Sequence, residues 1–320
     1  MPNRSSSPTP ARPASAGRRP SRTGVLRGPA PILASAVLWG TTGTAGSLAP
    51  TGAPAAAIGC AGLVLGGILL FLTSRGARSL PGACTRTERR LLILGALAVA
   101  GYPVTFYPAV ARTGVAVATV IALGSAPVFA GLLSWVTGQS RPTAGWMRAT
   151  TAAVLGCTLL VLGPGLTGHA TPMDPTGVML AACAGLSYAV YSLIGGRLIT
   201  RGHPSDAVMG VLFGAAGLLV LPLVLFAGTH WLTTARGGAV AVYLALFTVF
   251  LAYRLFGYGL RRTPASAATS LTLAEPAVAA ILGVGVLGER LTAASWCGLA
   301  VLALGLVLLA VPVGAGGRGR

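Results

Sequence analysis

Long apolar stretches, each about as long as a bilayer is thick, follow one another along this chain and restrict its fold to membrane-spanning helices. A helix needs about 20 apolar residues to cross the hydrocarbon core, and its backbone hydrogen bonds must be satisfied internally. Only 9% of the 320 residues are charged, against roughly a quarter in soluble domains, so an ordinary soluble fold is excluded. We predict ten spans, at residues 29–49, 53–73, 91–111, 114–137, 149–164, 175–196, 207–228, 239–260, 264–287 and 292–313.

The basic residues indicate how these spans are threaded, because cytoplasmic loops are enriched in lysine and arginine. All 23 basic residues are arginine. With the N-terminus inside, 19 of them fall on cytoplasmic segments, Arg112, Arg236 and Arg290 fall outside, and Arg254 lies within the eighth span. We therefore expect both termini in the cytoplasm, with anionic lipid headgroups as partners of the arginines at that face.

Two parts of the chain repeat at a spacing of 150 residues, so that Arg112 matches Arg262 and Trp146 matches Trp296. Each copy contains five predicted spans, and an odd number threads the second copy upside down relative to the first. The sequence thus predicts an all-α membrane protein with ten transmembrane helices in two inverted five-helix repeats. The expected layout is a disordered basic cytoplasmic tail at 1–28, the first repeat at 29–165, the inverted second repeat at 175–313, and a cytoplasmic tail at 314–320.

Glu275 is the most unusual residue, because it places an acid near the middle of the ninth span. It lies about 11 residues, or ~16 Å, from either end of that span, too far for its side chain to reach water along the helix. Such an acid is costly unless it is neutral, paired or facing a wet cavity. Two interpretations remain open. It is either a substrate or proton site, or a protonated residue that satisfies backbone opened by Pro276.

Arg254 is the basic residue within a span. It lies about six residues, or ~9 Å, from the cytoplasmic end, so it is either a snorkelling anchor or a cation in a cavity. A short turn joins its span to the next, which makes the two helices antiparallel neighbours. An ion pair between Arg254 and Glu275 is therefore a hypothesis.

Aromatic side chains cluster in matching spans of the two copies. Rings at span ends often form interfacial belts, but some of these lie deeper than a belt would place them. Our preferred lining of a substrate cavity is Trp39, Tyr102, Tyr107 and Tyr188, together with Arg254 and Glu275.

Prolines interrupt corresponding spans, Pro127 in the fourth and Pro276 in the ninth. Interruptions at matching places of two halves indicate a binding site at the membrane midplane. The copies differ at this point, because Ser125 stands where the second copy has Glu275. We therefore expect an asymmetric site.

Other chemistries find little support. The chain has no lysine, which excludes a Walker A phosphate loop and Schiff-base catalysis. Neither the five cysteines nor the three histidines have metal-ligand spacing, and no catalytic set can be assembled, so we expect no enzyme activity, cofactor or metal. Arginines between apolar segments point to lipid and argue against nucleic acid as a partner.

The residues Leu38-Trp39-Gly40 and Leu273-Ala274-Glu275-Pro276, continuing to Gly288-Glu289, resemble the EamA family of the drug/metabolite transporter superfamily. In the first copy Gln139 stands where the second has Glu289. The resemblance implies a carrier of the bacterial inner membrane, with Pro127, Pro276, Gly288 and Glu289 as structural motif positions.

Our hypothesis is a secondary transporter of a small amino-acid-like or drug-like metabolite, working by alternating access and exporting its substrate. Glu275 is the candidate for proton coupling. The alternatives are an uncoupled facilitator of the same fold and a membrane scaffold or enzyme. A homodimer is also considered.

Overall fold

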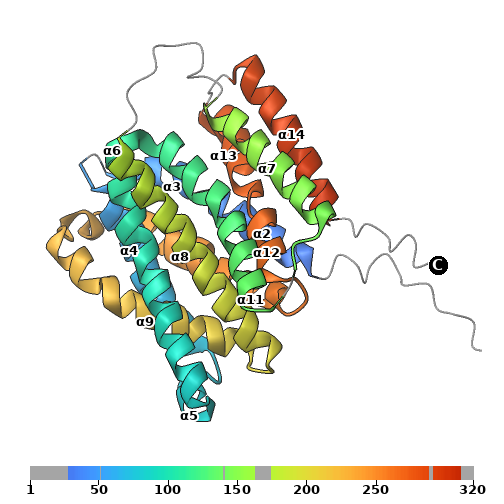
Figure 1. The fold of residues 1–320 in the computed structure, drawn as a ribbon. Helices are drawn as coiled ribbons and strands as arrows, with labels where there is room; N and C mark the ends of the chain where they lie inside the picture. Colours follow the sequence, from blue (N-terminus) through green and yellow to red (C-terminus); the bar gives the residue numbers. More distant parts are fainter. Residues whose placement is uncertain (1–27, 51, 140, 163–173, 288–290, 311–320) are drawn as a thin grey trace, which may run out of the picture.

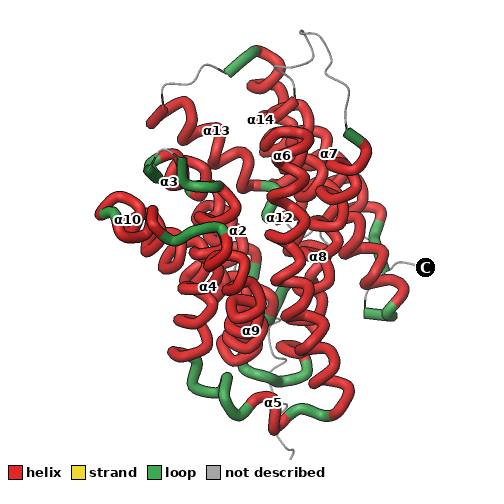
Figure 2. Tube along the Cα trace, turned by 90° about the vertical axis from the view of Figure 1, so that its left-hand side faces the viewer, coloured by secondary structure: helices red, strands yellow, loops and turns green. Residues whose placement is uncertain are grey.

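The structure is a computed structural model that describes residues 28–50, 52–139, 141–162, 174–287 and 291–310. Within these ranges the chain forms helices joined by short loops (Figures 1 and 2). The first half contains α2 (Pro29–Gly40), α3 (Thr42–Ser47), α4 (Ala55–Thr73), α5 (Leu80–Ala83), α6 (Arg86–Val136) and α7 (Ala144–Leu162). The second half contains α8 (Pro175–Thr200), α9 (Ser205–Phe226), η2 (His230–Thr233), α10 (Ala235–Tyr243), η3 (Leu244–Leu251), α11 (Ala252–Leu260), α12 (Ala265–Leu271), α13 (Ala274–Leu287) and α14 (Ala293–Ala310).

Nine helices in the described part of the chain are long and apolar enough to cross a membrane, and they match the second to tenth predicted spans. The first predicted span is different. It consists of the 12-residue α2 and the six-residue α3, separated at Thr41, and neither piece is long enough to cross alone. The expected tails at 1–28 and 314–320 lie almost wholly outside the described residues.

The third and fourth predicted spans are the two arms of α6. The helix is interrupted at Gly114, whose φ of 81° and ψ of 160° are not helical. Glycine tolerates a positive φ because it has no Cβ. Figure 1 shows the chain reversing direction at this bend, so the sequence-based division into two spans is confirmed.

Helices from the two halves pack on each other as matching pairs: α4 lies against α9, and α7 lies against α14. Gly67 of α4 and Gly217 of α9 stand 150 residues apart in the sequence, and each faces backbone atoms of the opposite helix. The backbones approach closely at both places because neither residue carries a side chain. The repeat seen in the sequence is thus also a repeat of helix contacts.

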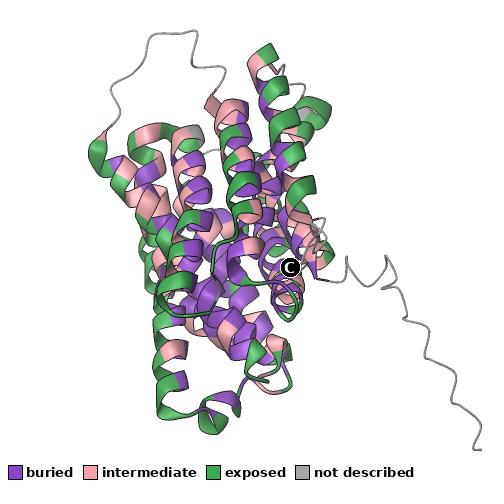
Figure 3. Cartoon of the chain, turned by 45° about the vertical axis from the view of Figure 1, so that its right-hand side comes forward, coloured by how far each residue is buried: buried purple, intermediate pink, exposed green. Residues whose placement is uncertain are grey.

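The two faces of most helices differ in their surroundings (Figure 3). Small and apolar residues fill the interior, including Phe213 and Phe256, each at most 1% exposed. Large apolar side chains such as Val136 and Phe226 point outward and are 72% and 88% exposed. An apolar outer surface of this extent needs lipid as its solvent.

Candidate functional site

Besides the bend of α6 at Gly114, three segments depart from regular α-helical geometry, and each of these contributes residues to one central cavity. The α2–α3 break is followed by Thr42, the π-helical segment η3 carries Thr248, and the α12–α13 break is followed by Glu275. Breaks and π-helical turns leave backbone groups outside the regular hydrogen-bond pattern, and inside a membrane such groups are tolerated only where protein or a wet cavity surrounds them.

Each irregular segment is held by an aromatic side chain from another helix. One of these contacts gives a hydrogen bond to a carbonyl of the irregular backbone, and the other two bind a threonine hydroxyl next to a helix break. They are Trp39 Nε1 donating to the Thr248 carbonyl at 2.8 Å, the Tyr188 hydroxyl donating to Thr272 Oγ1 at 2.7 Å, and the Tyr243 hydroxyl donating to Thr41 Oγ1 at 2.9 Å.

The cavity has a volume of about 220 Å³ and lies between the two halves of the chain. Five of the six residues predicted to bind substrate, all except Arg254, contribute to its wall. The wall also contains residues that were not preferred from the sequence. The full lining is Trp39, Thr42, Gly59, Gly62, Leu63, Val99, Tyr102, Pro103, Phe106, Tyr107, Thr119, Leu123, Tyr188, Tyr191, Phe213, Leu244, Thr248, Val249, Tyr253 and Glu275.

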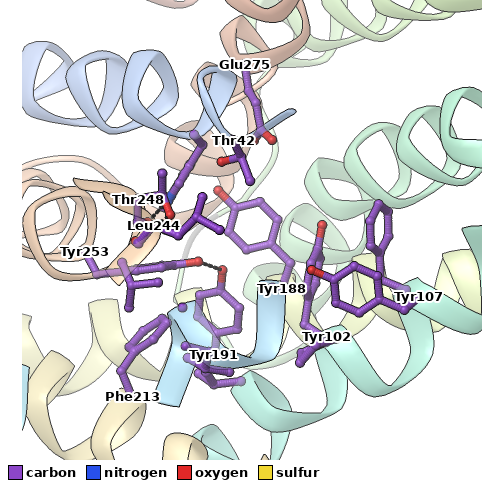
Figure 4. A pocket seen from close by; sticks show the side chains of 18 of the residues that line it. Thr42, Tyr102, Tyr107, Tyr188, Tyr191, Phe213, Leu244, Thr248, Tyr253 and Glu275 are labelled. Atoms are coloured by element: carbon purple, nitrogen blue, oxygen red, sulfur yellow. Dashed lines mark hydrogen bonds between the residues drawn. The ribbon is translucent and has the colours of Figure 1, made fainter. Parts of the chain in front are cut away.

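Glu275 stands in the first turn of α13, where the partial positive charge of the helix N-terminus favours an acid. Gly40 of α2 packs against its backbone, since a Cβ at Gly40 would lie 2.9 Å from the Glu275 carbonyl oxygen. Figure 4 shows the carboxylate pointing into the cavity, across from Tyr191 and Phe213. Within the described part of the chain the Glu275 carboxylate makes no hydrogen bond or ion pair. The hydrogen bond to backbone opened by Pro276, which one interpretation of the sequence expected, is therefore not formed among these residues.

A continuous aromatic wall faces Glu275. Trp39 lies 4.9 Å from Tyr253 and 6.3 Å from Tyr188, measured between ring centroids. Tyr188 in turn lies 6.5 Å from Tyr102. The Tyr191 and Tyr253 hydroxyls are 3.1 Å apart, so the wall combines ring faces with hydroxyl groups.

Gly59 leaves room for Tyr107 at the edge of the cavity, because a Cβ at this glycine would overlap the tyrosine hydroxyl. Tyr107 also lies 5.8 Å from the Phe106 ring, which stacks on Tyr102 at 5.4 Å. The third span thus presents its aromatic residues to the cavity as a packed group.

Arg254 is not placed where the sequence suggested. It follows Tyr253 by one position, which turns it about 100° around the helix from a residue that lines the cavity. Its guanidinium lies over the Phe250 ring, 5.2 Å from the centroid. The ion pair with Glu275 is therefore not formed, and the cavity wall, whose lining residues are all described, contains no arginine.

The two motif prolines have different surroundings. Pro127 lies inside the long second arm of α6, which continues through it. Pro276 follows Glu275 in the first turn of α13, directly after a break in the helix. Gly288 and Glu289 lie outside the described residues.

Sequence reasoning missed Phe213, Thr119 and Thr248 as part of the wall. Thr248 acts through its position in a π-helical segment, and no pattern in the sequence distinguishes that segment from an ordinary apolar helix. Phe213 is an aromatic residue within the apolar seventh span, and its neighbours give no indication of a cavity.

The fold and this cavity define a polytopic α-helical membrane protein with a central cavity between two repeated halves. Comparison with known proteins then identifies the family. The sequence profile of the EamA-like transporter family matches twice, at residues 26–162 and 175–311. The chain belongs to this family and is a transporter of the bacterial inner membrane.

Named relatives agree with this assignment. The uncharacterized transporter YwfM of Bacillus subtilis (strain 168) is 39% identical over 278 residues, covering 87% of this chain and 92% of the relative. The threonine/homoserine exporter RhtA of Salmonella typhimurium (strain LT2) is 31% identical over 228 residues, 70% of each chain. A crystal structure with 20% sequence identity has the same fold, with a TM-score of 0.71 over 90% of this chain and 96% of that chain.

Proposed function

We propose that this transporter carries a small amine-bearing metabolite through the central cavity by alternating access, and that Glu275 binds the substrate amine or a proton in turn. The observation that carries the proposal is the position of Glu275. It is the only acid in the cavity wall, it points into the cavity, and no described cation neutralises it. A proton or a cationic ligand would balance its charge in a place where charge is otherwise costly.

The aromatic wall suits the same ligand. Faces of Trp and Tyr rings attract cations, and the attraction is stronger in a site removed from water. Tyr102 and Tyr188 lie around the space into which the carboxylate points. Trp39 also lines this cavity. An ammonium group held by Glu275 would therefore lie close to rings on the facing wall.

The size of the cavity favours an amino-acid-like substrate. Pockets for drug-sized ligands have volumes of roughly 300–1,000 Å³. The central cavity, with a volume of about 220 Å³, is smaller. We therefore prefer a metabolite of amino-acid size over a drug-like compound.

The remaining polar lining determines how the rest of the substrate is held. The wall offers hydroxyl groups from Thr42, Thr119 and several tyrosines, and no arginine. We therefore do not assign Arg254 as a clamp for a carboxylate. Neutral hydrogen-bonding groups of the substrate would instead face the hydroxyls.

We further propose the threading predicted from the arginines, with ten spans, cytoplasmic termini and inverted halves. Contacts between chain segments support it. Arg112 pairs with Asp174 at 3.4 Å at one end of the bundle, and both belong to the predicted outer face. Arg201 pairs with Glu88 at 3.4 Å, and both belong to the predicted cytoplasmic face. In this arrangement the α2–α3 pair counts as the first span.

A second cavity supports a route out of the first. It is lined by residues of α3 and α10, including Arg236, and by Leu282 of α13. Thr41 and Tyr243 line this second cavity, while their chain neighbours Thr42 and Leu244 line the central one. The hydrogen bond between Tyr243 and Thr41 thus lies in the partition, and we propose that it breaks when the carrier opens outward.

Export is the preferred direction, on the basis of the relative RhtA, which is named as an exporter of threonine and homoserine. Comparing intracellular and extracellular metabolites with and without overexpression would identify the substrate. An export substrate would accumulate outside the cells that overexpress the protein. An excess inside those cells would instead indicate import.

The mechanism is tested with purified protein in proteoliposomes, using the identified substrate. We expect a pH gradient to drive accumulation by the wild type, and Glu275→Gln to abolish gradient-driven accumulation. If Glu275→Gln transported as well as wild type and neither responded to the gradient, coupling through Glu275 would be wrong. Wild-type equilibration without accumulation would identify an uncoupled facilitator.

A further inference from the structure

Three side chains that bind transition metals meet at the end of the bundle where α5 lies (Figure 1). Cys84 directly follows α5, Glu88 stands in the first turn of α6, and His203 lies in the turn between α8 and α9. Their ligand atoms all lie within 4.8 Å of one another. None of the three residues contributes to the wall of the central cavity.

The ligand atoms of this group are close enough to share one metal ion after small side-chain shifts. Glu88 Oε1 and His203 Nε2 are 3.5 Å apart, and Cys84 Sγ and His203 Nε2 are 3.9 Å apart. A hydrogen bond between nitrogen and oxygen normally measures about 2.7–3.2 Å. Tetrahedral Zn²⁺, with bonds of about 2.0–2.3 Å, separates its ligand atoms by roughly 3.3–3.6 Å. The distance between Glu88 and His203 lies within this range, and that between Cys84 and His203 lies slightly above it.

The carboxylate is oriented for such a role. Glu88 Oε2 accepts hydrogen bonds from the Thr85 backbone N–H at 3.0 Å and from the Thr85 hydroxyl at 2.9 Å. This capping box leaves Oε1 directed toward His203. Outer hydrogen bonds of this kind fix the ligands of a metal site.

Burial and charge are also compatible with a metal. Cys84 is 4% exposed, and the side chain of His203 is 17% exposed, so water can reach one side of the group. Arg201, beside Glu88, and Arg89, which donates to the Cys84 carbonyl, are the nearby cations that oppose metal binding. A thiolate and a carboxylate would neutralise Zn²⁺, and the side chain of Arg201 is 41% exposed and free to turn toward water.

We propose that Cys84, Glu88 and His203 bind one Zn²⁺ ion, with water as the fourth ligand, and that the ion joins the α5–α6 segment to the α8–α9 turn. Binding would displace the thiol proton to solvent. This proposal differs from the expectation drawn from the sequence, which was that the protein binds no metal. Spacing cannot reveal it, because Cys84 and His203 are separated by 119 residues.

The test uses the full chain purified in detergent without a histidine tag and freed of metal by chelation. Co²⁺ is titrated first, because bonding to a thiolate produces a charge-transfer absorption band, and Zn²⁺ is then used to displace it. We expect one metal ion per chain. Cys84→Ser should abolish the charge-transfer band, while His203→Gln and Glu88→Gln should weaken Zn²⁺ binding by at least about tenfold.

Cys183→Ser and Cys297→Ser are matched controls, because both cysteines are exposed and lie outside the group. They should leave stoichiometry and spectrum unchanged. If Cys84→Ser does not fold, His203→Gln decides the question, because its side chain lies in a turn near the surface. Binding unaffected by His203→Gln, or Co²⁺ bound without the thiolate band, would overturn the proposal.

Discussion

The fourth and ninth spans occupy the same place in the two repeats but differ in structure and surroundings. In the fourth, the helix runs unbroken through Ser125 and Pro127, and Gly185 of α8 packs directly against the Ser125 hydroxyl. In the ninth, the helix stops at Leu271 and restarts at Ala274, and Gly40 of α2 packs against the backbone of Glu275. At the matching position, the glycine contact therefore reaches the side chain in the first copy and the backbone in the second, where Gly40 also meets the Val278 side chain.

This difference explains how a duplicated frame contains a single charged site. Where the neighbouring helix covers the side chain, only a small residue fits, and the first copy has serine. Where it covers the backbone, the side chain is left to face the cavity, and an acid can be accommodated. The helix contacts are repeated, whereas the acid of the cavity wall is present only in the second copy.

Moving the acid from the second copy to the first should have the largest effect on transport and stability. The double variant Ser125→Glu with Glu275→Gln places the charge where α8 leaves no space for it. We expect no recovery of the transport lost in Glu275→Gln, and a loss of stability of at least about 3 kcal/mol from overpacking and an unpaired charge. Thermal unfolding in detergent and proteoliposome transport measure the two effects.

Ser125→Ala is the control for the first repeat and should keep both stability and transport. Recovery of gradient-driven transport in the double variant would contradict the comparison, because the two positions would then be interchangeable.

Removing the Tyr188 hydroxyl, which contacts the break between α12 and α13, should have an intermediate effect on transport and stability. Tyr188→Phe loses the hydrogen bond to Thr272, which is worth about 1 kcal/mol. We expect a lower melting temperature together with slower transport. Tyr191→Phe loses a hydrogen bond to Tyr253 that is not attached to the break, so it should lower stability with less effect on transport. Equal transport by both variants would argue against a role for the break.

Arg254→Gln should have the smallest effect on transport. Its guanidinium lies over Phe250 and outside the cavity wall. Transport measured under the same conditions should change by no more than roughly twofold, as for substitutions away from a site. A loss comparable with that of Glu275→Gln would restore Arg254 as a substrate ligand.

The membrane-helical architecture could be predicted from the sequence because apolar length is a strong local signal. Nine predicted spans are present as apolar helical segments of membrane length, and the reversal at Gly114 falls at the first residue of the fourth predicted span. The break at Thr41 could not be predicted, because the apolar stretch continues across it. Whether a long apolar stretch bends depends on the helices around it.

The site was partly predictable for a related reason. Trp39, Tyr188 and Glu275 stood out as polar or amphipathic residues deep within apolar spans, and all three line the cavity. The sequence was a poorer guide to the direction in which each side chain points around its helix. Arg254 lies one residue after a lining residue yet faces elsewhere, and the proposed zinc ligands Cys84 and His203 meet only through the tertiary fold.

The central claim is that the cavity beside Glu275 opens to each side of the membrane in turn. A single cysteine at Thr42, a lining residue, in an otherwise cysteine-free chain tests it while keeping Glu275 intact. Membrane-impermeant thiol reagents are applied from either side, with and without substrate, and a cysteine at exposed Ser79 serves as the one-sided control. We predict labelling of Thr42→Cys from both sides and protection by substrate, whereas labelling from neither side would contradict the account.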